Sequence, residues 1–228
     1  MSVITLTTDF GNKDHYVGSV KGALFKELDN VNIVDISHNI SPFNIVEAAY
    51  IIENSYKNFP DGSIHIIGID SEKTIEQSHL AIILDNHYFI CANNGIMSLL
   101  ASKINPEKII EINIHNDKVS TFSVIDVFVK IAAHIYRGGS IDLVGNQINI
   151  LKELYNLNPI LNEKTSEISG NVIYVDNYDN VVTNISKKIF LEFGKTRPFE
   201  INARNYIFKE IVDSYGNAIR FDIKKENR

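Results

Sequence analysis

The sequence predicts an α/β protein with two domains, a mostly parallel α/β sandwich at residues 1–150 and a smaller β-rich domain at residues 168–228. Up to about Gly139, short apolar runs alternate with amphipathic helical patterns. This alternation is typical of a parallel sheet with both faces covered by helices. From Ile168 onward the apolar runs are shorter and lie between turn residues, which favours a β-rich fold.

The expected strands of the first domain are short apolar runs that end at polar or turn residues. They are Val3–Thr8, Val31–Ile36, Ser63–Ile69, Leu80–Leu84, Tyr88–Ala92 and Lys108–Ile114, with Asp85-Asn86 as the turn of a hairpin. The expected helices place apolar residues three or four positions apart. They are Tyr16–Leu28, Ile45–Asn58, Gly95–Ile104 and Ser123–Tyr136, the last of which stops at Gly138-Gly139.

Residues 141–167 show no clean period, so we expect an irregular linker that runs over the surface. Three short β-like runs follow in the second domain, namely Gly170–Val175, Asn180–Thr183 and Phe199–Asn202. A chain of 228 residues is long enough for these elements to bury a substantial core.

Composition excludes several classes of partner. Hydrophobic residues make up 44% and charged residues 22% of the chain, as in ordinary soluble globular proteins. The formal net charge of −6 argues against a nucleic-acid binder or a protein of anionic membrane surfaces, since both need a basic face. The first residues show no charged leader and apolar segment, so we expect neither export nor membrane insertion.

The single cysteine, Cys91, lies in an apolar run, and we expect a packed core thiol rather than a nucleophile. One cysteine allows no disulfide within the chain, which fits a cytoplasmic location. The histidines and Cys91 show no ligand spacing, so no metal is expected, and no glycine-rich phosphate loop is present.

Asp9 is the first candidate for a binding residue, because it follows the strand Val3–Thr8 and precedes Gly11. A carboxylate at the carboxyl edge of a parallel sheet lies where such folds place their ligands, and it can accept hydrogen bonds from ribose hydroxyls. The alternative is that Asp9 only shapes a turn or caps a helix.

Several segments, in order along residues 4–215, together resemble one family, the S-adenosylmethionine hydroxide adenosyltransferases, whose relatives include fluorinases and chlorinases. The segments are Thr7-Thr8-Asp9-Phe10-Gly11, Ile33-Val34-Asp35-Ile36-Ser37-His38, Ile40-Ser41-Pro42, Phe59-Pro60-Asp61-Gly62, Asn93-Asn94-Gly95, Thr121-Phe122, Ala132-Ala133-His134, Asp176-Asn177-Tyr178-Asp179-Asn180 and Thr183-Asn184-Ile185. The resemblance implies a homotrimer, with each active site between the first domain of one subunit and the second domain of its neighbour.

The resemblance also implies that S-adenosylmethionine is the substrate and that no separate cofactor is needed. Water or hydroxide attacks its C5′ carbon and gives adenosine and methionine; in the halogenating branch a halide attacks instead. The sulfonium leaves as a neutral group, so the site mainly has to exclude bulk water and align the nucleophile.

Carried over by position, Asp9 is similar to the residue that holds the ribose, and Asn180 to the one that reads the adenine edge. Phe43 stands where relatives have an aromatic near the sugar, and Asn184 follows in the same segment as Asn180. The alternatives are a turn-shaping role for Asn180 and Asn184 and a plain core role for Phe43. Asp35 and His38 are expected to tie a strand end to the next loop.

The water site departs from the family pattern. Asp70 is kept, Gln77 stands where Arg is expected, and Ser123 stands where His is expected. Neither replacement supplies a guanidinium or an imidazole, and losing such a group commonly costs 10²–10⁴-fold in rate. Lys73 either restores positive charge or is simply exposed in a loop. We therefore expect weak hydrolysis at Asp70, Gln77 and Ser123.

The residues leave a second interpretation open, which is a catalytically inactive homologue that binds adenosine or serves as a trimeric scaffold. Residues 216–223 differ from the glycine-rich segment that holds the methionine part in relatives, so we expect an incomplete or rebuilt methionine pocket.

Overall fold

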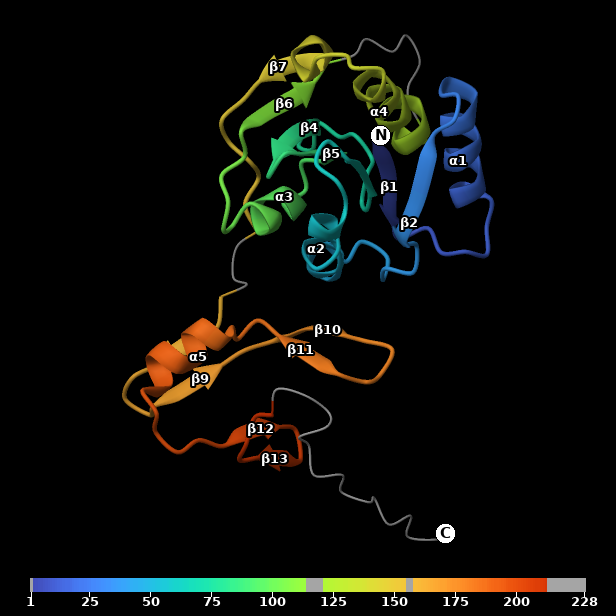
Figure 1. Cartoon of the computed structure of the whole chain (residues 1–228). Helices are drawn as coiled ribbons and strands as arrows, with labels where there is room; N and C mark the ends of the chain where they lie inside the picture. The colour runs from blue at the N-terminus through green and yellow to red at the C-terminus, as the bar shows by residue number, and fades with distance from the viewer. Residues whose placement is uncertain (1, 114–120, 155–157, 213–228) are drawn as a thin grey trace, which may run out of the picture. The chain divides into compact units, whose positions relative to one another are not determined.

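The computed structural model describes residues 2–113, 121–154 and 158–212, and it divides the chain into two compact units. Unit 1 consists of Met1–Leu157 with Val172–Val182, and unit 2 consists of Asn158–Asn171 with Thr183–Arg228. Both units mix helices and strands (Figure 1). No helix among the described residues has the length and apolar character needed to cross a bilayer.

The centre of unit 1 is a seven-stranded sheet with the order β2-β1-β3-β5-β4-β6-β7 (Figure 1). Its strands are β1 Val3–Thr8, β2 Asn32–Ser37, β3 Ile64–Gly68, β4 His79–Leu84, β5 His87–Ala92, β6 Lys108–Ile112 and β7 Gly145–Gln147. The pairs β1/β2, β1/β3 and β3/β5 are parallel, whereas β4 and β7 pair antiparallel to their neighbours. The mostly parallel sheet that the sequence predicts is therefore confirmed.

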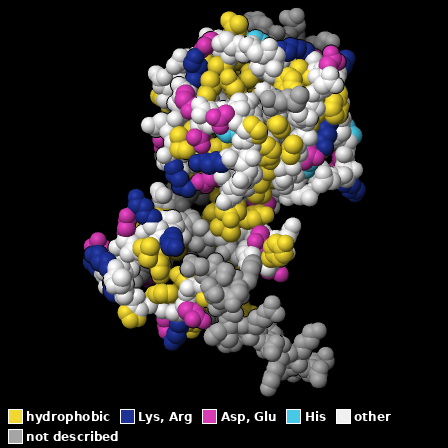
Figure 2. All heavy atoms as spheres, viewed as in Figure 1, with side chains coloured by type: hydrophobic (Ala, Val, Ile, Leu, Met, Phe, Trp, Pro, Cys, Tyr) yellow, Lys and Arg dark blue, Asp and Glu magenta, His cyan; other side chains and the backbone are white. Residues whose placement is uncertain are grey.

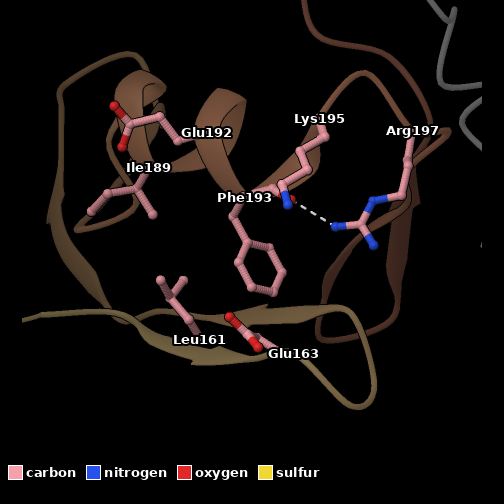
Figure 3. Close-up of a pocket in the computed structure, with 7 residues that line it drawn as sticks. All are labelled: Leu161, Glu163, Ile189, Glu192, Phe193, Lys195 and Arg197. Carbon is pink, nitrogen blue, oxygen red and sulfur yellow. Dashed lines mark hydrogen bonds between the residues drawn. The ribbon is translucent and has the colours of Figure 1, made fainter.

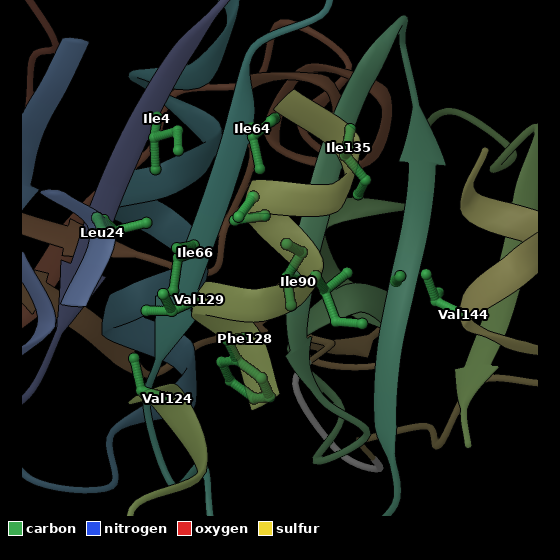
Figure 4. Close-up of a cluster of buried hydrophobic side chains, with 14 of the residues drawn as sticks. Ile4, Leu24, Ile64, Ile66, Ile90, Val124, Phe128, Val129, Ile135 and Val144 are labelled. Atoms are coloured by element: carbon green, nitrogen blue, oxygen red, sulfur yellow. The ribbon is translucent and has the colours of Figure 1, made fainter. Parts of the chain in front are cut away.

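Helical elements cover both faces of this sheet, as expected. They are α1 Tyr16–Glu27, α2 Ile45–Glu53, α3 Ile96–Leu100 and α4 Val129–Tyr136, with short 3₁₀ turns at η1 Tyr56–Asn58 and η3 Ile141–Val144 and a π-helical turn at η2 Val124–Phe128. One buried cluster joins the sheet to α1, η2 and α4, including Leu24, Phe128 and Val129 (Figure 4). A second cluster joins it to α2 and α3 through Ile52 and Met97.

Cys91 belongs to the second cluster and is buried, so the prediction of a core thiol is confirmed. Burial raises the pKa of the Cys91 thiol far above its ordinary value, and a protonated thiol is a poor nucleophile.

Two helices are shorter than the sequence predicts. The helix expected at 45–58 ends at Glu53, because the Asn54 side chain donates to the Tyr50 carbonyl at 2.8 Å and Ser55 Oγ donates to the Ile51 carbonyl at 2.9 Å. These side chains compete for the carbonyls that a continuing helix would use. The helix expected at 95–104 covers only Ile96–Leu100. The predicted strand 108–114 ends at Ile112, and its residue 114 lies outside the described residues.

The prediction of an irregular linker at 141–167 is wrong in part. This stretch contains η3, strand β7, strand β8 Ile160–Asn162 and the start of β9 Glu167–Ser169. The β8/β9 hairpin turns at Asn162, whose Oδ1 accepts hydrogen bonds from the amides of Lys164 and Thr165 at 3.1 and 3.3 Å. An Asn side chain that bonds its own following backbone is a local turn signal that periodicity does not detect.

The remaining elements confirm a β-rich character after residue 168. They are β10 Val172–Val175, β11 Val181–Thr183, β12 Ile201–Ala203 and β13 Tyr206–Phe208, together with helix α5 Lys187–Gly194. Helix α5 is absent from the sequence prediction, although its N-cap Ser186 accepts a hydrogen bond from the Ile189 amide at 3.2 Å, a normal start signal. The domain boundaries at 1–150 and 168–228 stay a prediction.

Candidate active site at the carboxyl edge of the sheet

The ends of β1 and β3 bring Asp9 and Asp70 to the same edge of the sheet. The two strands are parallel neighbours, and Thr8 pairs in register with Gly68. Asp9 follows Thr8 directly, and Asp70 comes two residues after Gly68. The backbone amide and the charge of Asp70 both influence the pKa of the Asp9 carboxyl, so the two residues lie near each other.

The Asp9 carboxylate is half-buried and surrounded by backbone amides. Its Oδ2 accepts a hydrogen bond from the Phe43 amide at 2.9 Å. Burial raises the pKa of the Asp9 carboxyl above its ordinary value, while the backbone amides of Phe43, Asp9 and Asp70 oppose that shift and the charge of Asp70 adds to it. A carboxylate with these properties retains lone pairs for a further donor, such as a hydroxyl group.

Phe43 approaches Asp9 through its backbone and leaves its ring open to solvent. The ring is 71% exposed, which excludes the core role that the sequence left open within this unit. Phe43 has a φ of 61°, and the next residue, Asn44, caps α2 by accepting from the Glu47 amide at 3.1 Å. Left-handed backbone at a bulky residue is uncommon and is held here by its neighbours.

His38 ties the loop that contains Asp9 to the end of β2. Its Nδ1 lies 2.8 Å from Thr8 Oγ1, and its carbonyl accepts from the Gly11 amide at 2.7 Å. These two contacts fall on either side of Asp9. They agree with the expectation that His38 connects a strand end with the next loop.

Asp35 supports His38 from the same strand. His38 Nε2 lies 3.2 Å from Asp35 Oδ1, at ion-pair distance but without the alignment of a hydrogen bond. The other oxygen of Asp35 accepts from Lys21 Nζ at 2.5 Å. Partial burial acts to raise the pKa of Asp35, but the bond from Lys21 and the neighbouring His38 outweigh it and lower the pKa.

Gln77 is close to Asp70, although not in the way that a water-binding residue requires. Its side chain is 8% exposed, and Nε2 donates to the Asp70 carbonyl at 2.8 Å and to the Glu72 carbonyl at 3.0 Å. An amide nitrogen has two hydrogens, so both are used within the loop. Lys73, in the same loop, is exposed.

Ser123 reaches this edge through the start of η2, which packs tightly against the end of β3. A Cβ on Gly68 would lie 3.1 Å from Val124 Cγ2 and 3.2 Å from the Phe10 ring, so glycine is what permits this close approach. The Ser123 side chain is 4% exposed, and η2 begins at the next residue.

An aromatic cluster beside Asp9 was not predicted from the sequence. The ring of Phe10 lies 5.8 Å from that of Tyr16 and 5.5 Å from that of Phe122, and Tyr16 and Phe122 are 5.7 Å apart. Tyr16 remains 42% exposed and presents an apolar surface next to the loop of Asp9. Each ring lies shortly after a strand or near the start of a helix at this edge. This position in the sequence was the feature from which the cluster could have been predicted.

Asn180 and Asn184 make local bonds. Asn180 closes the turn between β10 and β11, where its Nδ2 donates to Asp176 Oδ2 at 2.7 Å and its amide donates to Asp176 Oδ1 at 2.9 Å. The side-chain bond from Asn180 is the main cause that lowers the pKa of Asp176. Asn184, in unit 2, accepts from the Asn171 amide at 2.7 Å. These contacts are those expected of turn residues, which was the alternative interpretation.

Unit 2 contains a cleft of about 520 Å³ that holds none of the predicted site residues (Figure 3). Its lining consists of Leu161, Glu163, Ile189, Glu192, Phe193, Lys195 and Arg197. The Arg197 guanidinium is engaged with Ser166 Oγ at 2.8 Å and with the Phe193 and Gly194 carbonyls at 2.6 and 2.9 Å. Because its donors serve the end of α5, Arg197 is poorly suited to hold a ligand.

The described residues contain no group of three or more His, Cys, Asp or Glu side chains that could hold a metal ion. The predicted departure at residues 216–223 lies outside the described residues. The structure brings Asp9, Asp70 and Phe43 together. Gln77 is bonded to the Asp70 carbonyl, and Ser123 lies at the start of the adjoining helical turn η2.

These features define an α/β protein with two strand-end carboxylates, Asp9 and Asp70, at one edge of its sheet. Family models of the SAM hydroxide adenosyltransferase N-terminal domain and C-terminal domain match residues 4–145 and 170–222. The chain belongs to the S-adenosylmethionine hydroxide adenosyltransferase family, which confirms the resemblance seen in the sequence.

Individual relatives agree with this assignment. An (R)-S-adenosyl-L-methionine hydrolase from Methanocaldococcus jannaschii is 32% identical over 218 residues, which cover 92% of this chain and 78% of the relative. A fluorinase from Actinopolyspora mzabensis is 31% identical over 62 residues, 27% of this chain and 21% of the relative. The crystal structure of an uncharacterized conserved protein from Thermotoga maritima superposes with a TM-score of 0.81 at 25% identity, covering 95% of this chain and 85% of that one.

Proposed function

We propose that this protein binds S-adenosylmethionine and catalyses attack of water on its C5′ carbon, giving adenosine and methionine. The observation that carries the proposal is the placement of Asp9 and Asp70 at the carboxyl edge of the sheet, after the paired strands β1 and β3, with the Phe43 amide bonded to the Asp9 carboxylate. The name of the Methanocaldococcus jannaschii relative supports the same reaction.

In this proposal Asp9 holds the ribose. Its Oδ2 already accepts from the Phe43 amide, and its other lone pairs are suited to the ribose hydroxyls. The exposed ring of Phe43 packs against the sugar. Asn180 and Asn184 are assigned to adenine recognition by family position, and binding would require Asn180 to exchange its bond with Asp176 for the adenine edge.

Asp70 orients the attacking water and accepts its proton. The C5′–O bond forms as the C5′–S bond breaks, and the bonding electron pair returns to sulfur, which leaves as neutral methionine. Since Gln77 and Ser123 supply neither a guanidinium nor an imidazole, we infer that the water is weakly held and turnover is slow.

We infer that the active protein is a homotrimer, as the family resemblance implies. In unit 2, no described residue is buried, and Tyr206, Ile207 and Phe208 of β13 are between 49% and 70% exposed. Figure 2 shows apolar side chains open to solvent on this part of the chain. A unit without a core of its own is suited to packing against another copy. A cytoplasmic location completes the proposal, to which the single buried Cys91 is suited.

A second candidate function is favoured by Gln77, both of whose amide hydrogens are already used. It is a catalytically inactive homologue that binds adenosine or acts as a trimeric scaffold. Separate calorimetric titrations with adenosine, methionine and S-adenosylmethionine, combined with chromatography for released adenosine, distinguish the two. Binding of adenosine without any release from S-adenosylmethionine supports the inactive homologue, and release of adenosine supports the enzyme.

A further inference from the structure

Four consecutive carbonyl groups around Asp70, those of residues 69–72, each accept a hydrogen bond from a buried side chain. The donors are Asn94, Gln77 and His79, which are 3%, 8% and 2% exposed. The bonds run from Asn94 Nδ2 to the Ile69 carbonyl at 3.0 Å, from Gln77 Nε2 to the Asp70 and Glu72 carbonyls at 2.8 and 3.0 Å, and from His79 Nε2 to the Ser71 carbonyl at 2.9 Å.

Backbone carbonyls in loops commonly face water, so it is unusual that four consecutive carbonyls in this loop all accept hydrogen bonds from buried side chains. The donors come from separate places in the fold, since His79 begins β4, Asn94 follows β5, and Gln77 closes the loop itself. Each donor is buried, and an unpaired buried donor is costly, so the three side chains and the loop hold one another in a single arrangement.

Asp70 is the residue that this arrangement constrains most. It has a φ of 41°, in the left-handed region that is uncommon for non-glycine residues, although aspartate adopts it more often than most. Residues 70–77 contain neither glycine nor proline, so the loop has no residue whose own backbone preference fixes such a turn. The side-chain donors supply the constraint instead.

His79 is suited to a fixed donor. Burial lowers the pKa of its imidazole, and its ring packs edge-on against Phe128 at a centroid distance of 4.8 Å. Because the Ser71 carbonyl can only accept, the proton of the neutral ring lies on Nε2. His79 thus donates to the loop from a neutral, fixed ring.

We propose that Gln77, together with His79 and Asn94, is a positioning residue that fixes the backbone and carboxylate of Asp70 and does not itself contact the attacking water. The reaction that Asp70 serves rests on the proposed function. The arrangement of the loop does not, and it is tested separately.

The first test replaces Gln77 by Met, which has a similar length and no donor. The matched control is Gln147→Met, since Gln147 is the only other glutamine of the chain and is exposed on β7. Hydrogen exchange of the unliganded proteins is followed by mass spectrometry over residues 70–77. We expect exchange about tenfold faster or more in Gln77→Met, from the loss of two bonds, and unchanged in Gln147→Met. Equal exchange in the two variants would overturn the proposal.

The second test uses Gln77→Glu, whose carboxyl can donate a hydrogen bond to a carbonyl only when it is protonated. Burial against two carbonyl oxygens raises the pKa of such a group. Exchange over residues 70–77 should therefore slow as pH falls, relative to the unmodified protein after correction for intrinsic exchange. If Gln77→Glu changes hydrogen exchange over residues 70–77 by the same factor at all pH values, the side-chain amide of Gln77 contributes packing and not hydrogen bonds to the loop.

Turnover and adenosine affinity complete the experiment. We expect Gln77→Met to lower the rate of adenosine release by roughly 10²-fold, the loss that misplacing a catalytic group by about 1 Å can cause, while adenosine affinity changes less than twofold. An equal fall in both would indicate general damage and count against positioning. If the unmodified protein releases no adenosine, the proposed function fails, and the two exchange measurements still decide the role of Gln77.

Discussion

Replacing Asp9 by Ala is expected to weaken adenosine binding while leaving the fold intact. The change removes the acceptor of the Phe43 amide and the acceptor proposed for the ribose hydroxyls. A hydrogen bond to a charged group contributes about 1.5–3 kcal/mol, and this loss corresponds to roughly a 10- to 150-fold higher dissociation constant. Phe43, which is 71% exposed, also loses the acceptor of its backbone amide, so the upper part of the range is expected.

The assay is calorimetric titration with adenosine. Asp142→Ala is the matched control, because Asp142 is an exposed aspartate in η3 that pairs with Lys108 at 2.8 Å, outside the proposed site. We expect the control to bind adenosine as the unmodified protein does. If Asp9→Ala binds adenosine with unchanged affinity and circular dichroism shows an intact fold, Asp9 is only a turn residue and the ribose assignment is wrong.

The raised pKa of Asp9 adds a test of sign. A carboxyl whose pKa is higher in the folded than in the unfolded protein binds its proton more tightly when folded, so its contribution to stability falls as pH rises through that pKa. Asp9→Asn removes this titration and keeps an oxygen for the Phe43 amide. The variant is therefore expected to have a higher Tm than the unmodified protein at pH 7, with a smaller difference at pH 4. A lower Tm at pH 7 would contradict the burial argument.

Three further results are expected. Burial, together with the neighbouring His87, lowers the pKa of His65 to about 3. The free energy of unfolding should therefore fall as pH drops from 6.5 toward 3, on the order of 4 kcal/mol in all. In urea titrations, His65→Phe should reduce this pH dependence, whereas the control His15→Phe, at an exposed position, should not. Light scattering at micromolar concentration should give the mass of three chains of 25.8 kDa, and a monomer would exclude the trimer. The double variant Gln77→Arg with Ser123→His should release adenosine faster than either single variant, because a guanidinium has enough donors for both the loop carbonyls and a water. A double variant that releases adenosine no faster than the single variants would argue against a shared water site.

The strand pattern at the N-terminus was enough to predict where Asp9 lies in the sheet. The expected and observed bounds of β1 are the same, Val3–Thr8, and parallel pairing with β3 places the residues after both strands at one edge. That Asp9 and Asp70 meet there follows from topology, which the alternation of strands and helices indicates. The two cores also follow from this alternation, since the strands β3, β4, β5 and β6 present apolar residues to both faces.

What periodicity could not predict depends on contacts between distant residues. Asn94 and His79 reach the carbonyls of Ile69 and Ser71 because β5 lies beside β3 and β4 lies beside β5. The early end of α2 at Glu53 and the turn at Asn162 depend on side chains that bond nearby backbone, a choice that apolar spacing does not record. For the same reason, the sequence placed Gln77 in the water site by position, while its hydrogen bonds lie within the loop.

We propose that the chain hydrolyses S-adenosylmethionine at a site with a weakly held water. The measurement that tests it most directly is the rate at which the unmodified protein releases adenosine from S-adenosylmethionine, followed by chromatography with methionine measured in parallel. We expect equal amounts of adenosine and methionine. We also expect a release rate well below about one turnover per second, which is the lower end for ordinary enzymes. Release at about once per second or faster would contradict the inference that the water is weakly held. A rate of release no higher than the uncatalysed rate would contradict the proposed hydrolysis.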